Sequence, residues 1–269
     1  MRLPGRLLVT GLLLAATAPA LLPAQTVEEH VATGVELFEK RLDVNGALQQ
    51  YEAALAIDSL SYDANWRAAQ ALVDIGKVTP DESKDPARDS AYARAERLAR
   101  VAVEVNPNGA DGWYILSAAI GRASLTKGKK ERVKRAGEIR AAALRSIELN
   151  PKEDGAYHVM GRWNAEIMRL SGFNRFFAKT FLGGAIFNAA AWDSASIYMA
   201  KAVELRPQWI YHRLDYAEIL VDMDQYSQAR VELQQVAELP IGDAMDPEYK
   251  KQGAAVLTEI EGKKDKTND

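Results

Sequence analysis

Apolar residues recur at intervals of three and four along the chain from residue 27 onward, with polar residues between them. This spacing places apolar side chains on one face of a helix, whereas a half-buried strand needs strict alternation, which no stretch of the chain keeps up. The same stretches are rich in Ala, Leu, Glu, Arg and Gln, which have high helix propensity, and the glycines lie mostly at their ends. The pattern therefore predicts an all-α protein.

Within these predicted helices, one phrase of three residues occurs four times. The second residue comes four positions after the first, the third comes three positions later, and a helix stop follows five positions after that. The copies are Ala47, Tyr51 and Ala54; Ala95, Ala99 and Ala102; Ile139, Ala143 and Ser146; and Ala195, Met199 and Ala202. The stop is Ser59 in the first copy and Pro107, Pro151 or Pro207 in the others. Mostly small residues at this spacing let a helix pack closely against its neighbour, and a proline ends one helix or begins the next, so we expect four closely packed helices of one kind.

Each stop is followed by the beginning of another predicted helix. Trp113 and Tyr157 lie six residues after their prolines, and Leu116, Met160 and Tyr216 lie nine residues after theirs. The two helical phrases and their spacing resemble the tetratricopeptide repeat, a helix–turn–helix unit of about 34 residues. The resemblance implies an α-solenoid, a right-handed superhelix of stacked repeats. The alternative from the residues alone is an ordinary helical bundle with alanine-rich faces.

The spacing between repeats is longer than one unit. Successive prolines are 44 and 56 residues apart, so about 10 and about 22 residues are inserted. We expect these insertions in a polar loop, a basic stretch and an aromatic segment, at 79–90, 127–135 and 169–190. The predicted solenoid of about five repeats spans 25–262 and includes a covering helix at 246–261, with a disordered tail at 263–269.

Residues 1–24 have the pattern of an export signal. Arg2 and Arg6 precede a short apolar run from Leu7 to Ala18, and a stretch of small residues follows up to Ala24. The run is shorter than the roughly 20 residues needed to span a bilayer. We therefore expect a signal peptide cleaved near Ala24 and an exported protein, periplasmic or secreted. The alternative is a protein anchored in the membrane by an uncleaved signal.

Composition narrows the function classes. The 269 residues include 34 Lys and Arg against 37 Asp and Glu, a formal net charge of −3, and 48% are apolar, which is typical of a folded soluble protein. The balanced charge argues against a nucleic-acid partner. The chain has no cysteine, which excludes disulfides, Cys-ligated metals and a Cys nucleophile, and its three histidines leave little room for a His-rich metal centre.

Two stretches resemble a particular family of tetratricopeptide proteins, the regulator of microtubule dynamics family, over roughly residues 105 to 225. An H-x-x-G-R-W phrase is matched by His158, Gly161, Arg162 and Trp163, and a following aromatic-basic segment by Phe173, Arg175, Ala178, Phe181 and Gly183. Eukaryotic members are associated with microtubules and organelle contacts, whereas this leader is typical of bacterial export. What the resemblance implies here is the architecture and a protein-binding role, with no catalytic residues to carry over.

The sequence offers no motif for catalysis. It contains no H-E-x-x-H, no Walker-type glycine loop, no G-x-S-x-G and no Asp-rich calcium loop. We therefore predict a protein that is not an enzyme and that has neither cofactor nor metal.

The candidate recognition residues lie on one predicted helix face. His158, Arg162, Glu166 and Arg169 have helical spacing, and in repeats of this type the first helix lines the concave groove. The predicted partner-binding groove consists of Trp66, Gln70, Tyr114, His158, Arg162, Glu166, Leu214 and Glu218. Two alternatives stay open: an intrahelical ion-pair ladder that tethers the inserted hairpin, and inter-repeat packing for Trp66 and Tyr114.

Two further segments support a second hypothesis. A basic patch consists of Lys127, Lys129, Lys130, Arg132, Lys134 and Arg135, and an aromatic group consists of Phe173, Phe176, Phe177, Phe181 and Phe187. We predict a protein-interaction scaffold that binds a peptide or protein segment in its concave groove. The alternative is a peripheral membrane-associated adaptor that uses the Phe-rich insertion and the basic patch, although packing of the insertion onto the solenoid is favoured over membrane contact.

Overall fold

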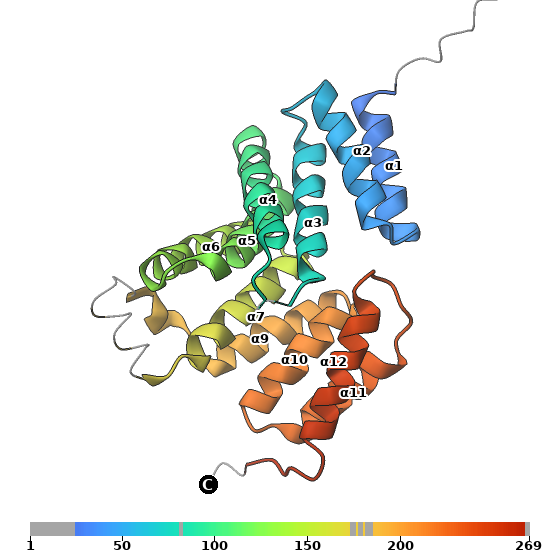
Figure 1. The fold of residues 1–269 in the computed structure, drawn as a ribbon. Helices are drawn as coiled ribbons and strands as arrows, with labels where there is room; N and C mark the ends of the chain where they lie inside the picture. The colour runs from blue at the N-terminus through green and yellow to red at the C-terminus, as the bar shows by residue number, and fades with distance from the viewer. Residues whose placement is uncertain (1–24, 81–82, 173–175, 177–179, 181–184, 267–269) are drawn as a thin grey trace, which may run out of the picture.

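The computed structural model describes residues 25–80, 83–172, 176, 180 and 185–266 (Figure 1). Over this part of the chain it contains helices and turns and no strand, which confirms the all-α prediction. The elements are α1 (Val27–Lys40), α2 (Val44–Ile57), α3 (Tyr62–Lys77), α4 (Pro86–Val105), α5 (Ala110–Ala123), η1 (Ser124–Thr126), α6 (Lys129–Leu149), α7 (Asp154–Arg169), η2 (Ala185–Ala189), α9 (Trp192–Leu205), α10 (Ile210–Asp222), α11 (Tyr226–Glu238) and α12 (Asp246–Glu259).

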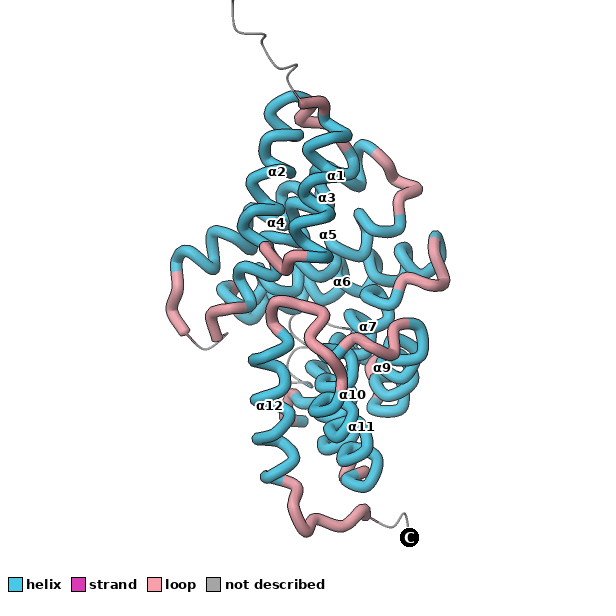
Figure 2. Tube along the Cα trace, turned by 90° about the vertical axis from the view of Figure 1, so that its right-hand side faces the viewer, coloured by secondary structure: helices cyan, strands magenta, loops and turns pink. Residues whose placement is uncertain are grey.

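The helices pair in chain order and the pairs stack on one another. α1 packs on α2, α3 on α4, α5 on α6, α7 on α9, and α10 on α11, while α12 closes the series against α10 and α11. Figures 1 and 2 show the stack as a curved body with the C-terminal helices turned back toward α3. The first helix of each pair contacts the first helix of the next, as α3 does with α5 and α5 with α7.

The same turn joins one helix pair to the next at four places. The backbone oxygens of Asp58, Asn106, Asn150 and Arg206 each accept a hydrogen bond from the N–H three residues on, at 3.2, 3.1, 3.0 and 3.0 Å. At Asp58, Asn106 and Asn150 the side-chain oxygen also accepts from the N–H two residues on, at 2.9, 3.2 and 3.0 Å. Asp and Asn favour such turns because their short side chains replace backbone acceptors. The helix stop that follows each copy of the phrase in the sequence thus corresponds to the same turn in the structure.

The small residues of the phrase lie where the helices touch. All members of the four copies are buried except Ile139, which is partly exposed. Two first-helix glycines allow the same close approach: a Cβ on Gly34 would lie 2.3 Å from Tyr51 Cε1, and one on Gly76 would lie 2.2 Å from Tyr92 Cε1. The close packing predicted from the four-plus-three spacing is confirmed.

The expected insertions are partly longer helices. α4 begins at Pro86 and α6 at Lys129, so most of 127–135 and the end of 79–90 are helical, and these helices have 20 and 21 residues. Asp85 starts α4 because its Oδ1 accepts from the N–H groups of Ala87 and Arg88, and Pro86 fits the first helical position. The loop interpretation of 79–90 was wrong from Pro86 onward, because the helix start signal lies inside a polar segment.

The third insertion and the tail are described in part. Phe187 in η2 is 4% exposed and packs beside Val133 and Trp163, while Phe173, Phe177 and Phe181 lie outside the described residues. The tail prediction was wrong for residues 263–266, because this segment returns to α11 and to the turn before it. Asp265 accepts from the Ser227 N–H at 2.8 Å, Arg230 donates to the Lys263 carbonyl, and Lys266 pairs with Asp224.

Candidate functional site

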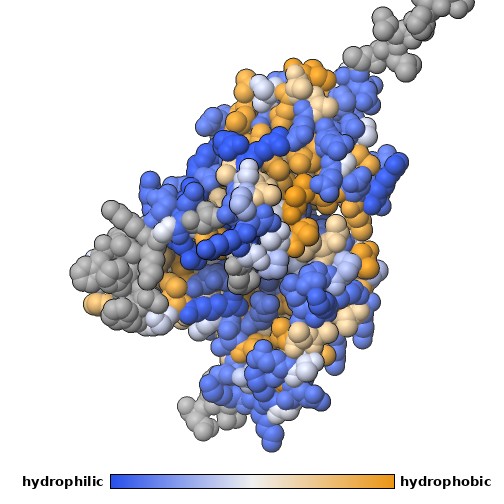
Figure 3. All heavy atoms as spheres, viewed as in Figure 1, coloured by the Kyte–Doolittle hydropathy of each residue, from blue (hydrophilic) through white to orange (hydrophobic). Residues whose placement is uncertain are grey.

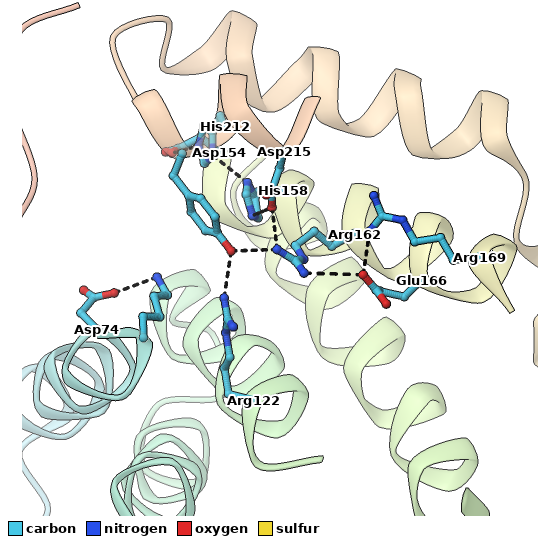
Figure 4. A network of polar contacts seen from close by, with 11 residues as sticks. Asp74, Arg122, Asp154, His158, Arg162, Glu166, Arg169, His212 and Asp215 are labelled. Carbon is cyan, nitrogen blue, oxygen red and sulfur yellow. Dashed lines mark hydrogen bonds and ion pairs between the residues drawn. The ribbon is translucent and has the colours of Figure 1, made fainter. Parts of the chain in front are cut away.

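The polar residues predicted on α7 face α10. Arg162 Nη1 lies 2.9 Å from Asp215 Oδ2, and Arg169 Nη2 lies 2.7 Å from Asp222 Oδ2. Along α7, Glu166 Oε1 lies 3.5 Å from Arg162 Nη2 and 2.8 Å from Arg169 Nη1 (Figure 4). The predicted intrahelical ladder is therefore present, and its two arginines connect the fourth helix pair to the fifth.

Tyr211 on α10 is the centre of the surrounding contacts. Its hydroxyl accepts hydrogen bonds from Arg122 Nη2 on α5 at 2.9 Å and from Arg162 Nη1 on α7 at 3.0 Å. Its ring stacks on Tyr249 of α12, with centroids 4.6 Å apart and planes at 10°. Lys77 Nζ of α3 lies 5.0 Å from the same ring, within cation–π range. We call the surface where α3, α5, α7, α10 and α12 meet around Tyr211 the inner face.

Lys77 remains charged in this environment. Burial is the largest single influence and lowers the pKa of Lys77, but the carboxylate of Asp74, 2.8 Å away, and the hydroxyls of Tyr249 and Tyr211 together raise it more, so the net pKa lies well above its usual range. The ammonium group therefore keeps its attraction to the Tyr211 ring at neutral pH.

Two histidines lie beside Tyr211 at the contact between α7 and α10. His158 and His212 are 6% and 3% exposed, and their Nδ1 atoms are 2.8 Å apart. His212 Nε2 lies 2.8 Å from Asp154 Oδ2, and His158 Nε2 lies 3.0 Å from Asp215 Oδ2. Burial lowers the pKa of His158 to about 4 and also lowers the pKa of His212, so both imidazoles are neutral at pH 7.

The carboxyl groups around this contact have divergent pKa values. Burial raises the pKa of Asp215, but the charge of Arg162 and the contact with His158 lower it more, so its net pKa lies below its usual range. Burial, together with the charge of Asp215, raises the pKa of Glu218 to about 7. The inner face thus carries fixed charges at Arg162 and Asp215 next to a carboxyl that titrates near neutrality.

The predicted groove residues divide into accessible and buried ones. Arg162 and Glu166 have side chains 34% and 53% exposed, and Gln70 and Glu218 are half-buried. Leu214 is 1% exposed in the core of the last helices, so its assignment as a groove contact was wrong, because α11 and α12 cover this side of α10. His158 is likewise covered, since its ring packs against His212 and Tyr211.

The two predicted aromatic contacts serve packing between repeats. Trp66 is 9% exposed in the core cluster of α3, α4 and α5, and its Nε1 donates to Asp63 Oδ1 at 3.0 Å. Tyr114 is half-buried on Gly155 of α7, where a Cβ would lie 2.4 Å from the Tyr114 ring. Of the two interpretations left open for these residues, the structure supports packing.

Sequence reasoning missed most of the residues that surround the α7 row and Tyr211. They are Asp74, Lys77, Arg122, Tyr211, His212, Asp215, Asp222 and Tyr249, which come from four other helices. The available signal was that the chain has only three histidines, two of them in first-helix positions of successive repeats. Spacing within one helix does not tell which residue of a distant helix lies opposite.

The basic patch is partly exposed and partly paired. Lys127, Arg132 and Lys134 are exposed, whereas Arg135 pairs with Glu96 of α4 at 2.8 Å and with Glu131 at 3.3 Å. The side chains of Lys129 and Lys130 lie outside the described residues. A shallow hollow of about 340 Å³ beside the patch is lined by Asp89, Ala93, Glu96, Arg97, Arg100, Ala123, Lys127 and Arg135.

The described residues around Tyr211 contact one another through polar side chains. In this part of the chain no three His, Asp or Glu side chains converge as metal ligands, and no helix is both long and apolar enough to cross a membrane. Neither His158 nor His212 has a serine or threonine among its described polar contacts. Figure 3 shows hydrophilic residues over most of the face that it views, with hydrophobic ones gathered mainly over the upper helices.

Comparison with known proteins gives a family and a fold. A family model described as regulator of microtubule dynamics protein 1-3 matches residues 31–261. Regulator of microtubule dynamics protein 1 of Bos taurus is 27% identical over 196 residues, which are 69% of this chain and 60% of that protein. This chain therefore spans about 60% of the length of that relative.

Two solved structures have a similar arrangement of helices. TTC0263, a thermophilic TPR protein in Thermus thermophilus, aligns with a TM-score of 0.60 at 18% identity and covers 87% of this chain and 100% of its own. The pilF protein of Pseudomonas aeruginosa aligns with a TM-score of 0.50 at 14% identity and covers 87% and 90%. These likenesses show the fold, which is the tetratricopeptide-type α-solenoid that the repeated phrase predicted.

Proposed function

Because the chain belongs to the regulator of microtubule dynamics family and is built as a tetratricopeptide-type α-solenoid, we propose that it is a non-catalytic protein-interaction scaffold. Its ligand is a peptide or protein segment that binds along the inner face. A solenoid suits this role because it presents side chains from several repeats on one continuous surface.

The observation that carries the proposal is the row Arg162, Glu166 and Arg169 on α7. These side chains are 34%, 53% and 31% exposed, so a partner can reach them. Asp215 and Asp222 on α10 hold the two arginines at 2.9 and 2.7 Å, so their positions are set before a partner arrives. Fixed polar groups lose little conformational entropy on binding, and arginine is a frequent anchor in protein interfaces.

The proposal is tested by a pair of matched charge reversals. Glu166→Lys alters the row, and Glu148→Lys is the control on α6, which contributes nothing to the inner face. Both glutamates are exposed, at 53% and 69%, and both pair at 2.8 Å with an arginine three residues away, Arg169 and Arg145. Partners are first identified by crosslinking in the native cell envelope and then captured with each variant.

We expect Glu166→Lys to capture less of the identified partner and Glu148→Lys to capture as much as the wild type. Both variants must keep the helical circular dichroism of the wild type. Equal capture by the two variants would show that the inner face is the wrong surface.

Microtubule regulation is not carried over to this chain. The bovine relative bears that name, but this chain spans about 60% of its length. The pattern of residues 1–24 favours export from a bacterial cell, which does not favour a tubulin partner. The partner class proposed here is therefore a protein segment of the same exported compartment.

Export itself is part of the proposal. The charged start, the short apolar run and the small residues up to Ala24 support a signal peptide that is cleaved after Ala24. N-terminal sequencing of the protein from fractionated cells is the test. A mature chain that begins at Gln25 in the periplasm or medium supports export, and a membrane-bound chain that keeps residues 1–24 supports the anchored alternative.

A second candidate function is membrane association through the edge near α6 and the insertion. Phe176 is 61% exposed, Lys127, Arg132 and Lys134 are exposed, and Ile186 Cδ1 would lie 3.9 Å from a Cβ on Gly137, so insertion and α6 are adjacent. Aromatic and basic side chains together suit the interface of anionic membranes. Flotation of the mature protein with vesicles containing anionic lipid is the test, and no flotation would remove this candidate.

A further inference from the structure

The contact between His158 and His212 is part of a line of four side chains that joins α7 to α10. Asp154 Oδ2 lies 2.8 Å from His212 Nε2, the two Nδ1 atoms are 2.8 Å apart, and His158 Nε2 lies 3.0 Å from Asp215 Oδ2. The order is carboxylate, imidazole, imidazole, carboxylate, as Figure 4 shows. Each of the three contacts needs one proton between its two atoms to be a hydrogen bond.

Two neutral imidazoles have one proton too few for these three contacts. They carry two protons on four ring nitrogens. Protons placed toward Asp154 and between the Nδ1 atoms leave His158 Nε2 facing Asp215 without one. Consistently, this buried nitrogen is without a hydrogen-bond partner among the described residues. The structure thus contains a specific atom, His158 Nε2, at which a third proton would bind.

The charges nearest to the pair act in both directions. For His158, burial lowers the pKa, the carboxylate of Asp215 raises it, and the charges of His212 and Arg162 lower it. For His212, burial lowers the pKa, Asp154 raises it and Arg206 lowers it. Glu218 on α10, whose pKa burial raises to about 7, adds a further group beside Asp215.

The other elements packed around the pair act mainly through Tyr211, whose ring centroid is 4.5 Å from that of His158. Arg122 of α5 bonds its hydroxyl, Lys77 of α3 lies over its ring, and Tyr249 of α12 stacks on it. From these sides the pair faces the cations of Arg122 and Lys77 and the aromatic rings of two tyrosines. None of them offers an additional negative charge to an imidazolium.

We propose that the His158–His212 pair is a proton-sensitive junction that holds the last repeat, α10 to α12, against α7 at neutral pH and releases it as the pH falls. A third proton places an imidazolium beside the Arg162 guanidinium, and both then share the single carboxylate of Asp215. A charge in a buried site beside a like charge is unfavourable, whereas the separated histidines would be hydrated.

The direction in which pH changes the stability of the junction follows from proton linkage. The pKa of His158 is about 4 in the closed junction, against an ordinary value of 6.5, so the closed state binds fewer protons than the open state between these values. The stability of the junction is therefore complete above pH 6.5 and is lost as the pH falls toward 4. In this window each pH unit changes the ratio of closed to open junctions by about tenfold. Glu218 acts oppositely, because a carboxyl with a raised pKa costs stability as the pH rises from 4.5 to 7.

The test is hydrogen exchange of the full chain at pH 7 and pH 5, with Glu218→Gln present in every variant so that the opposing titration of Glu218 is removed. The measured quantity is the protection of amides in α10 to α12 relative to those in α1 and α2 of the same molecule, after correction for intrinsic exchange. In the Glu218→Gln parent we expect this ratio to fall about twentyfold between the two pH values. When His158→Gln, which cannot take up the proton, is added to this parent, we expect a change of less than about threefold.

The chain supplies a matched control, since its one other histidine, His30, lies on α1. His30→Gln added to the Glu218→Gln parent should show the same pH dependence as that parent. A constant ratio in the parent, or an equal fall when His158→Gln is added, would overturn the proposal. Should His158→Gln fail to fold, titration of the three imidazole rings by NMR in the wild type decides: His158 titrating below pH 5 supports the junction, and at 6.5 or above overturns it.

Discussion

The close approach of α3 and α4 predicts that one alanine will destabilise the protein while another stabilises it. Gly76 lies against Tyr92, where a Cβ would be 2.2 Å from Cε1, 2.7 Å from Cζ and 2.8 Å from Cδ1. Tyr92 is fully buried, so its ring has no open space into which to move. In α5, by contrast, a Cβ on Gly121 would meet only Ile139 Cδ1, at 4.0 Å.

The size of each effect follows from these distances. Alanine in place of glycine inside a helix gains about 1 kcal/mol of helix propensity. At position 76 this gain is set against overpacking, which costs about 1–3 kcal/mol and more where the neighbour cannot move. We expect Gly76→Ala to lower the free energy of unfolding by about 1–2 kcal/mol and Gly121→Ala to raise it by about 0.5–1 kcal/mol.

Urea denaturation followed by far-ultraviolet circular dichroism measures both variants against the wild type. Because the same substitution is made in both helices, a change in the unfolded chain affects the two alike. Opposite signs of the two changes support the packing argument. If Gly76→Ala is as stable as Gly121→Ala, the tyrosine-on-glycine contact does not set the approach of α3 and α4.

Three further predictions concern the inner face. Asp215→Ala should lower the free energy of unfolding by about 3 kcal/mol, because it leaves Arg162 without its buried carboxylate. Asp222→Ala removes the carboxylate of the more exposed pair and should lower it by less than about 1 kcal/mol. Urea denaturation measures both variants, and equal losses would contradict the assignment of burial. Tyr211→Phe keeps the ring but removes the acceptor of two guanidinium hydrogen bonds, so we expect a loss of about 1–2 kcal/mol in the same assay, and an unchanged midpoint would show that the hydroxyl contributes nothing. Because the pKa of Glu218 is about 7 in the folded protein, its stability contribution is complete below pH 4.5 and lost as the pH rises through 7. Glu218→Gln should therefore be more stable than the wild type by about 3 kcal/mol at pH 8 and similar to it at pH 4.5; the same difference at both pH values would refute this.

The fold was largely predictable because repeated small residues and stops are local features. The positions of Ala99, Ala102 and Pro107 relative to one another require only helical geometry and the chemistry of proline. The start of α4 was missed because a polar segment that contains Asp85 and Pro86 reads equally as a loop and as a helix start. Local patterns therefore give the repeat and leave its boundaries less certain.

The candidate site was predictable only on α7. His158, Arg162 and Glu166 share a face because of their spacing, and the structure shows that face in contact with α10. That Leu214 would be covered, or that Lys77 would reach Tyr211 across the inner face, depends on how far the superhelix turns over several repeats. That rotation is the sum of many packing contacts, and no single motif encodes it.

The most direct test of the account asks which surface of the solenoid touches a partner. A photo-crosslinking amino acid is placed at position 166 on the inner face or at position 148 on α6, and the full chain is made in its native cells. The account predicts a crosslinked partner protein from position 166 and none from position 148. Crosslinks from position 148 alone, or the same products from both positions, would contradict it.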